Sequence, residues 1–191
     1  MAAPTARYYG YNFTDAAIGY NVSSVLTWVD LLYANKLSIK TEEQNIEFEG
    51  DGQKRTLYVT QGLSAEFTPD ALNVAAAGAI FNKTVVTTSV PDSGSNLVWF
   101  GEDTETKGAS VGFKATMSAI KNVAGTESIV TLKLYIPLGT LTLGAPGDVE
   151  TAKKLGAQVW RLSAVKTTVD AVGAALPSVP TGGAFYALYE V

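Results

Sequence analysis

Short runs in which apolar and polar residues alternate recur along most of this chain. The clearest run is residues 110–118, whose apolar members are Val111, Phe113, Ala115 and Met117. Successive side chains of a β-strand point to opposite faces of a sheet, so this spacing predicts a strand with one buried face. Residues 129–137 alternate in the same way. Together the two runs predict an antiparallel hairpin whose loop, residues 122–126, is too long for a tight two-residue turn.

The stretch of residues 35–81 carries the most detailed local pattern. An alternating run over residues 37–40 leads into an acidic run, and Gly50-Asp51-Gly52 follows with the glycines that favour chain reversal. Two more strand-like runs come after this turn, over residues 56–60 and 63–67. We expect residues 42–56 to form an acidic loop or hairpin excursion from a single domain that spans residues 1–191.

A helix is predicted directly after these strands. Thr68 supplies a hydroxyl for the N-cap, Pro69 suits the first helical position and Asp70 places a carboxylate in the first turn. Apolar residues then recur at helical spacing, and the helix is expected to end near Asn82.

The remaining segments add further strands and an N-terminal arm. The other strand candidates are residues 23–33, 84–90, 97–101, 158–166 and 184–191. Residues 1–24 hold five aromatic side chains without a clear period, which predicts an arm that lies across its own domain or across a neighbouring subunit. The whole pattern predicts a mainly β fold, an antiparallel β-sandwich or barrel with one flanking α-helix and long loops.

The composition argues against most kinds of catalysis and of nucleic-acid binding. The 191 residues include no cysteine and no histidine, so the chain lacks a thiolate nucleophile, the usual general base near neutral pH and the common zinc ligands. Catalysis by carboxylates, Ser/Lys or tyrosine alone stays open. The net charge is −4, and no basic cluster is larger than a pair, so tight binding to phosphates is disfavoured. We expect no enzyme activity, no cofactor and no metal site.

The sequence also predicts no contact with a membrane. No apolar span approaches about 18 residues, the length needed to cross a bilayer. The first residues lack a basic region followed by an apolar core, so no secretory signal is expected. These features predict a protein that is made in a cytoplasm and stays there at least initially.

Four segments fall in an order that resembles one protein family. They are Leu37-Ser38-Ile39, Ile46-Glu47-Phe48-Glu49-Gly50-Asp51-Gly52, Gly62-Leu63-Ser64-Ala65-Glu66-Phe67 and Leu72-Asn73-Val74-Ala75-Ala76-Ala77-Gly78. In this order the chain resembles the tail tube (major tail) proteins of long-tailed bacteriophages, in which a strand leads to a G-D-D or G-D-G element and a strand and helix follow. The second aspartate of the commoner form is Gly52 here, so no role for that carboxylate carries over.

The resemblance implies a structural protein of the virion that forms a homo-oligomer. Copies would assemble in hexameric rings, and the rings would stack into a tube for genome ejection. The partners implied are other copies of the chain, other tail proteins such as the tape measure and tail terminator, and DNA that passes through the lumen without specific binding. Assembly would take place in the host cytoplasm. The alternative is a carbohydrate- or protein-binding β-sandwich module of a virion fibre or decoration protein.

Charged and aromatic side chains supply the candidates for contacts between subunits. The acidic set is Glu42, Glu43, Glu47, Glu49 and Asp51, followed by the basic pair Lys54 and Arg55. The basic set is Lys107, Lys114, Lys121 and Lys133, and opposite charges across a subunit contact set its register and orientation. The aromatic candidates, in a closing strand expected to extend a neighbour's sheet, are Tyr186 and Tyr189. The predicted turn glycines are Gly50 and Gly52.

Other interpretations of the same residues stay open. Glu47 and Glu49 on one strand face would lie roughly 7 Å apart, near the separation of an inverting glycosidase pair. A solvated acidic loop is the simpler alternative, and the acids do not follow the spacing of an EF-hand calcium loop. For residues 184–191 the simpler alternative is an ordinary edge strand of the same subunit.

Overall fold

The fold is a mainly antiparallel β-structure with one short helix, as the alternating sequence predicts. The computed structural model describes residues 6–31, 34–50, 53–69, 74–84, 86–87, 98, 109–143 and 159–191. The strands are β1 (Arg7–Val22), β2 (Val25–Asp30), β3 (Ala34–Gly50), β4 (Gln53–Pro69), β5 (Ala109–Val123), β6 (Thr126–Leu143), β7 (Trp160–Ala164) and β8 (Ala187–Glu190). The helix α1 is Val74–Ile80.

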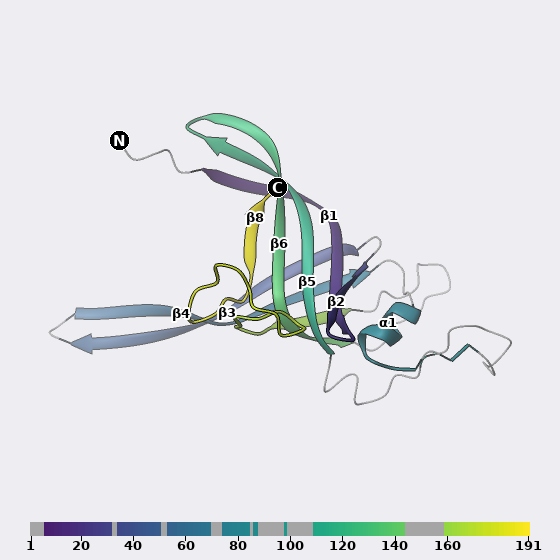
Figure 1. Ribbon diagram of the computed structural model, residues 1–191. Coiled ribbons are helices and arrows are strands. Elements are labelled where there is room, and N and C mark those ends of the chain that lie inside the picture. The colour runs from purple at the N-terminus through teal and green to yellow at the C-terminus, as the bar shows by residue number, and fades with distance from the viewer. Residues whose placement is uncertain are drawn as a thin grey trace, which may run out of the picture.

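The strands form two layers that share the long strand β6. The hydrogen-bonded order is β2-β1-β5-β6-β7-β4-β3, and β8 also pairs with β6. Leu132 to Tyr135 of β6 pair with β8, whereas Gly139 to Leu143 pair with β7. In Figure 1, β1, β2, β5, β6 and β8 form one layer, and β3 and β4 cross behind it. The sheet is not closed into a barrel, so the sandwich-like form of the prediction is the one observed.

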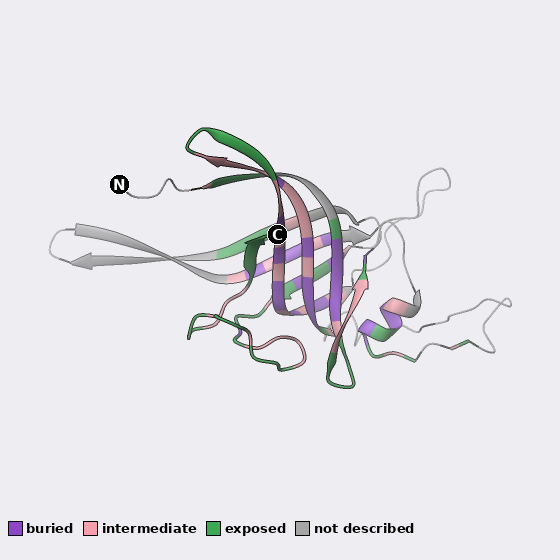
Figure 2. Ribbon diagram, turned by 45° about the horizontal axis from the view of Figure 1, so that its top comes forward, coloured by how far each residue is buried: buried purple, intermediate pink, exposed green. Residues whose placement is uncertain are grey.

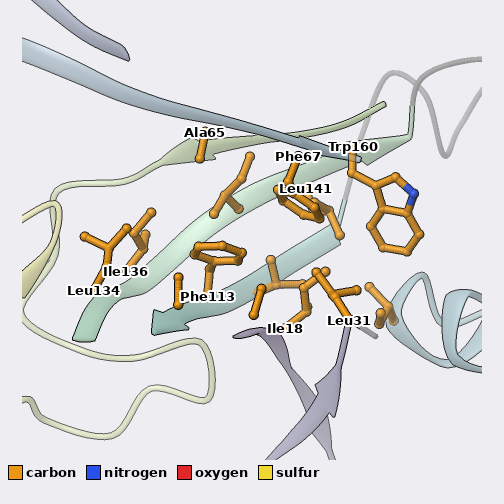
Figure 3. Close-up of a cluster of buried hydrophobic side chains, with 14 of the residues drawn as sticks. Ile18, Leu31, Ala65, Phe67, Phe113, Leu134, Ile136, Leu141 and Trp160 are labelled. Atoms are coloured by element: carbon orange, nitrogen blue, oxygen red, sulfur yellow. The ribbon is translucent and has the colours of Figure 1, made fainter. Parts of the chain in front are cut away.

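The core fills the space where the two layers cross. Phe113 of β5 and Phe67 of β4 are fully buried, and their rings stack with centroids 5.3 Å apart (Figure 3). Trp160 of β7 lies beside Phe67 with a centroid distance of 6.0 Å. Helix α1 closes one end of this cluster through Ala77 and Ile80. Figure 2 shows that the buried positions lie at this crossing, whereas β8 and the tip of the β5–β6 hairpin are exposed.

The β5–β6 connection is tighter than the sequence predicts. The strands pair without a break up to Val123 and Thr126, so the loop is the two residues Ala124 and Gly125. Their φ values are 51° and 89°, the left-handed pair of a type I′ turn. Asn122 supports the turn because its Oδ1 accepts a hydrogen bond from the backbone N–H of Gly125 at 3.1 Å. The prediction of a longer loop is therefore wrong, because polar residues 122 and 126 continue the strands.

Residues 7–22, within the predicted arm of residues 1–24, form a strand of the sheet. β1 pairs with β2 on one side and β5 on the other, and Ala16 and Ile18 are buried in the core. A tight turn at Ser23 and Ser24, both with positive φ, joins β1 to β2. The segment 23–33, predicted as extended, contains β2.

Helix α1 is described over Val74–Ile80, and the predicted start at Thr68 and Pro69 is wrong because both residues belong to β4. Pro69, expected at the first helical position, is the last residue of β4 and pairs with Ala34 of β3. The register shifts between Ala34 and Lys36 opposite this residue, and a β-bulge is one of the places in a sheet where a proline fits. Asp70 lies outside the described residues, as do most of the predicted strands 84–90 and 97–101. The predicted helix end is confirmed: α1 stops at Ile80, and Asn82 follows with φ 51°.

Candidate subunit interface

The β3–β4 hairpin reaches beyond the rest of the sheet. The two strands pair from Ala34 and Pro69 at one end to Gly50 and Gln53 at the other. Strand β7 pairs with β4 only from Leu63 to Phe67. Over residues 43–60 the two strands therefore pair with each other alone in the described part of the chain, and Figure 1 shows this end of the hairpin extending away from the other strands. The predicted excursion of residues 42–56 is a regular hairpin.

The acidic candidates lie along this hairpin. The register places Glu43 opposite Thr60, Glu47 opposite Thr56 and Glu49 opposite Lys54. Arg55 lies opposite Phe48. The chain reverses between Gly50 and Gln53, where the turn was predicted, whereas Asp51 and Gly52 themselves lie outside the described residues.

Glu42 stands at the base of the projecting part. It is exposed and pairs with Gly62, where a shift in register marks a bulge between Glu42 and Glu43. A Cβ atom added to Gly62 would lie 2.9 Å from Oε2 of Glu42, so the glycine gives this carboxylate room to lie across the strand.

The four candidate lysines do not form one patch. Lys114 and Lys121 are seven residues apart in β5, and the β5–β6 pairing between them is continuous, so they lie on opposite faces of the sheet. Lys133 pairs with Thr116 and therefore shares the face of Lys114. The Nζ of Lys114 lies 4.4 Å from the ring centroid of Trp28, and Lys107 lies outside the described residues.

Lys121 already forms contacts within its own chain. Its Nζ lies 2.7 Å and 3.0 Å from the two carboxylate oxygens of Glu190, and the hydroxyl of Tyr8 donates to Oε2 of Glu190 at 2.9 Å. The hydrogen bond from Lys121, followed by that from Tyr8, lowers the pKa of Glu190. The same contact with Glu190 raises the pKa of Lys121. This cluster, which we call the C-terminal clasp, ties β8 to β1 and β5.

Strand β8 is an exposed edge. Tyr186 and Tyr189 are 46% and 47% exposed, and Leu188 is 52% exposed. One side of β8 pairs with β6, and the backbone N–H of Val191 extends that pairing to Thr131. The alternation of an antiparallel ladder then directs the backbone groups of Leu188 and Glu190 away from β6. No other described strand pairs with that side.

Strand β2 is the outer strand at the opposite side of the same layer. It pairs with β1 alone among the described strands, and Val25 is 62% exposed. The layer that contains β1, β5 and β6 thus ends in two different uncovered strands, β2 and β8.

Two comparisons of the sequence with known proteins find no relationship. No family model matches the chain, and the search of curated proteins finds no similar sequence. Within the described residues, no three acidic side chains gather as a metal-binding group. The only helix in that part of the chain, seven residues long, is too short to span a membrane.

Proposed function

We propose that the protein is a structural subunit of a phage tail tube that self-assembles into stacked, hexameric rings. The observation that carries this proposal is the β3–β4 hairpin, which extends past the strands of its own subunit. A hairpin of this length without a partner strand is marginally stable in water by itself. Contact with a second copy supplies the surface that it lacks.

The two uncovered strands of the sheet add to the argument. An exposed strand edge presents unpaired N–H and C=O groups, which are a template for pairing with another chain. The uncovered strands β2 and β8 differ in sequence, so a contact between them joins one patch to a different patch. Such a heterologous contact forms rings when the rotation between neighbours closes. The sequence resemblance to tail tube proteins agrees with this kind of assembly.

The charge of the hairpin suggests how neighbours are oriented. Glu43, Glu47 and Glu49 lie in its projecting part, and Lys114 and Lys133 share one face of the main layer. We propose that the hairpin of one copy crosses onto this lysine-bearing face of the next. The other proposed partners are the tape measure and tail terminator proteins, and DNA that passes through the lumen without specific binding. The proposed final location of the protein is the tail of the virion.

Electron microscopy of two matched variants tests the proposal. Glu47→Lys with Glu49→Lys reverses two charges on the hairpin, and Glu127→Lys reverses an exposed charge near the tip of the β5–β6 hairpin, six residues along β6 from Lys133. We expect tubes of uniform bore from the wild type and from the second variant, and none from the first. Circular dichroism should show all three proteins folded.

The outcomes separate the parts of the proposal. Normal tubes from the hairpin variant would eliminate the charged crossing contact but leave the tube itself standing. A wild-type protein that remains monomeric at the highest soluble concentration, by sedimentation as well as microscopy, would eliminate self-assembly.

A further inference from the structure

A cavity of about 400 Å³ lies between β6, β8 and the loop that connects β7 to β8. Its lining includes three tyrosines and three prolines: Tyr135, Pro137, Pro177, Pro180, Tyr186 and Tyr189. Its volume falls within the range of cavities that bind ligands in proteins. We call it the tyrosine pocket.

The loop that walls the tyrosine pocket is held in place by its own backbone. Leu176 donates its N–H to the carbonyl of Thr168 at 2.9 Å, and Gly183 donates to the carbonyl of Pro180 at 2.8 Å. Gly183 has φ 78°, and a Cβ there would lie 3.0 Å from the carbonyl oxygen of Thr167, so this position requires glycine. Thr167 is buried, and its hydroxyl donates to the carbonyl of Val169. A fixed wall lowers the entropy lost when a ligand binds.

The polar side chains of the pocket carry uncharged hydroxyls, which donate a hydrogen bond as well as accept one. No lysine, arginine, aspartate or glutamate belongs to the lining, whose only hydroxyl-bearing residues are three tyrosines and Ser178. Within the described residues, no hydrogen bond engages the hydroxyl of Tyr135, Tyr186 or Tyr189. Burial, followed by the charge of Asp170, raises the pKa of Tyr135, so its phenol stays protonated at neutral pH and is able to donate.

This combination of groups suits one class of ligand. Proline residues present carbonyl acceptors and apolar rings but have no N–H to donate. A polyproline II helix leaves its carbonyls free of internal hydrogen bonds, and aromatic-lined grooves are a recurring site for such segments. A glycan, by contrast, carries many hydroxyl donors, and no carboxylate or amide side chain lines the pocket to accept from them.

We propose that the tyrosine pocket binds a proline-rich, extended segment of a partner protein. The rings of Tyr135, Tyr186 and Tyr189 pack against proline rings, and their hydroxyls donate to the carbonyls of the segment. Tyr135 pairs with Lys114 and Tyr189 pairs with Lys133, so the pocket lies on the lysine-bearing face that a neighbour's hairpin is proposed to cross. The inference therefore concerns the unassembled protein and does not depend on tube formation.

Titration calorimetry with a decaproline peptide tests the proposal on unassembled protein. We expect saturable binding of decaproline and none of a ten-residue Gly/Ser peptide or of maltohexaose. Tyr186→Phe and Tyr189→Phe each remove one donor but keep the ring, and each should raise the Kd about 3- to 10-fold. Tyr9→Phe removes the hydroxyl of another exposed tyrosine, which lies outside the pocket, and should leave the Kd unchanged.

Three results would overturn the inference. They are the absence of decaproline binding to the wild type, an unchanged Kd in both pocket variants, and binding of maltohexaose with an affinity equal to that of decaproline. The last result would point to a glycan site. Circular dichroism of each variant confirms that a loss of binding is not a loss of fold.

Discussion

The stacked pair Phe67 and Phe113 provides a direct test of how the two layers pack. Phe67 is 1% exposed on β4 and Phe113 is 0% exposed on β5, with ring centroids 5.3 Å apart and planes 26° apart. The two rings come from strands that are not hydrogen-bonded neighbours in the sheet order. Their contact therefore exists only if the layer of β4 and β7 lies over the layer of β5 and β6 (Figure 3).

Truncation of either ring should destabilise the protein strongly. Replacing a buried phenylalanine by alanine costs about 3–5 kcal/mol in the free energy of unfolding, from lost burial and from the cavity that remains. In the double variant the two cavities merge and the ring–ring contact is lost only once. The double loss should therefore be smaller than the sum of the single losses, by about 0.5–1.5 kcal/mol for the aromatic contact.

Urea unfolding followed by tryptophan fluorescence measures these values. Trp160 is a suitable probe because its ring centroid lies 6.0 Å from that of Phe67. Phe67→Ala, Phe113→Ala and the double variant complete the cycle, with Phe→Leu substitutions in reserve for any protein that fails to fold. Ile129→Ala, at a position 77% exposed, is the control and should change stability by less than about 0.5 kcal/mol. Single losses that add within about 0.3 kcal/mol would show that the rings do not touch and that the layered arrangement is incorrect.

Two further predictions concern the junction of the layers and the C-terminal clasp. Gly139→Ala should lower the free energy of unfolding by about 1–3 kcal/mol, measured by thermal unfolding, because the new Cβ would lie 2.7 Å from Cδ1 of Leu162. Gly112→Ala is the control and should cost clearly less, since its new Cβ would have its nearest contact at 3.4 Å. Equal losses in the two variants would contradict the close approach of β6 and β7. Because the folded pKa of Glu190 lies below its ordinary value of 4.5, the clasp stabilises the protein above that pH and loses its effect as pH falls through the lowered pKa. The stability difference between wild type and Glu190→Gln should therefore be present at pH 6 and shrink toward pH 3, and a pH-independent difference would argue against the contact with Lys121.

The strands with strict alternation were predictable from the sequence. In β5 the predicted apolar face is buried at Val111, Phe113 and Ala115, and in β6 Leu132 and Ile136 are buried as well. One side of each strand faces the core along most of its length, so apolar and polar residues alternate in the sequence with a period of two. The mainly β fold follows from these segments.

Strand β1 was not predictable in the same way. Its pairing with β5 shifts register between Gly10 and Asn12 and again between Phe13 and Asp15. Each shift moves the following side chains to the other face, so residues 7–22 show no continuous alternation. The aromatic residues at its start therefore gave the pattern of an arm, although the segment lies inside the sheet.

The contacts between distant segments of the chain could not be predicted from the sequence either. Tyr8 and Glu190 stand 182 positions apart, and only the pairing of β1, β5, β6 and β8 brings them to one place. The sequence analysis grouped Lys121 with the other candidate lysines, because the contact of Lys121 with Glu190 of β8 depends on strand pairing that the sequence does not reveal. The candidate interface could be predicted as a set of residue types but not as a surface.

The way in which β6 divides its partners explains why the sheet has uncovered strands at all. Its first half pairs with β8 and its second half with β7, so the layer of β7, β4 and β3 turns away from β8. Closure of the sheet within one copy would require the projecting hairpin to return to β8 or β2, and the described strands show no such pairing. Neither β2 nor β8 contains a lysine or a proline, the residues that commonly block edge-to-edge association. An edge without these residues favours pairing with another chain, and the proposed assembly makes that pairing specific.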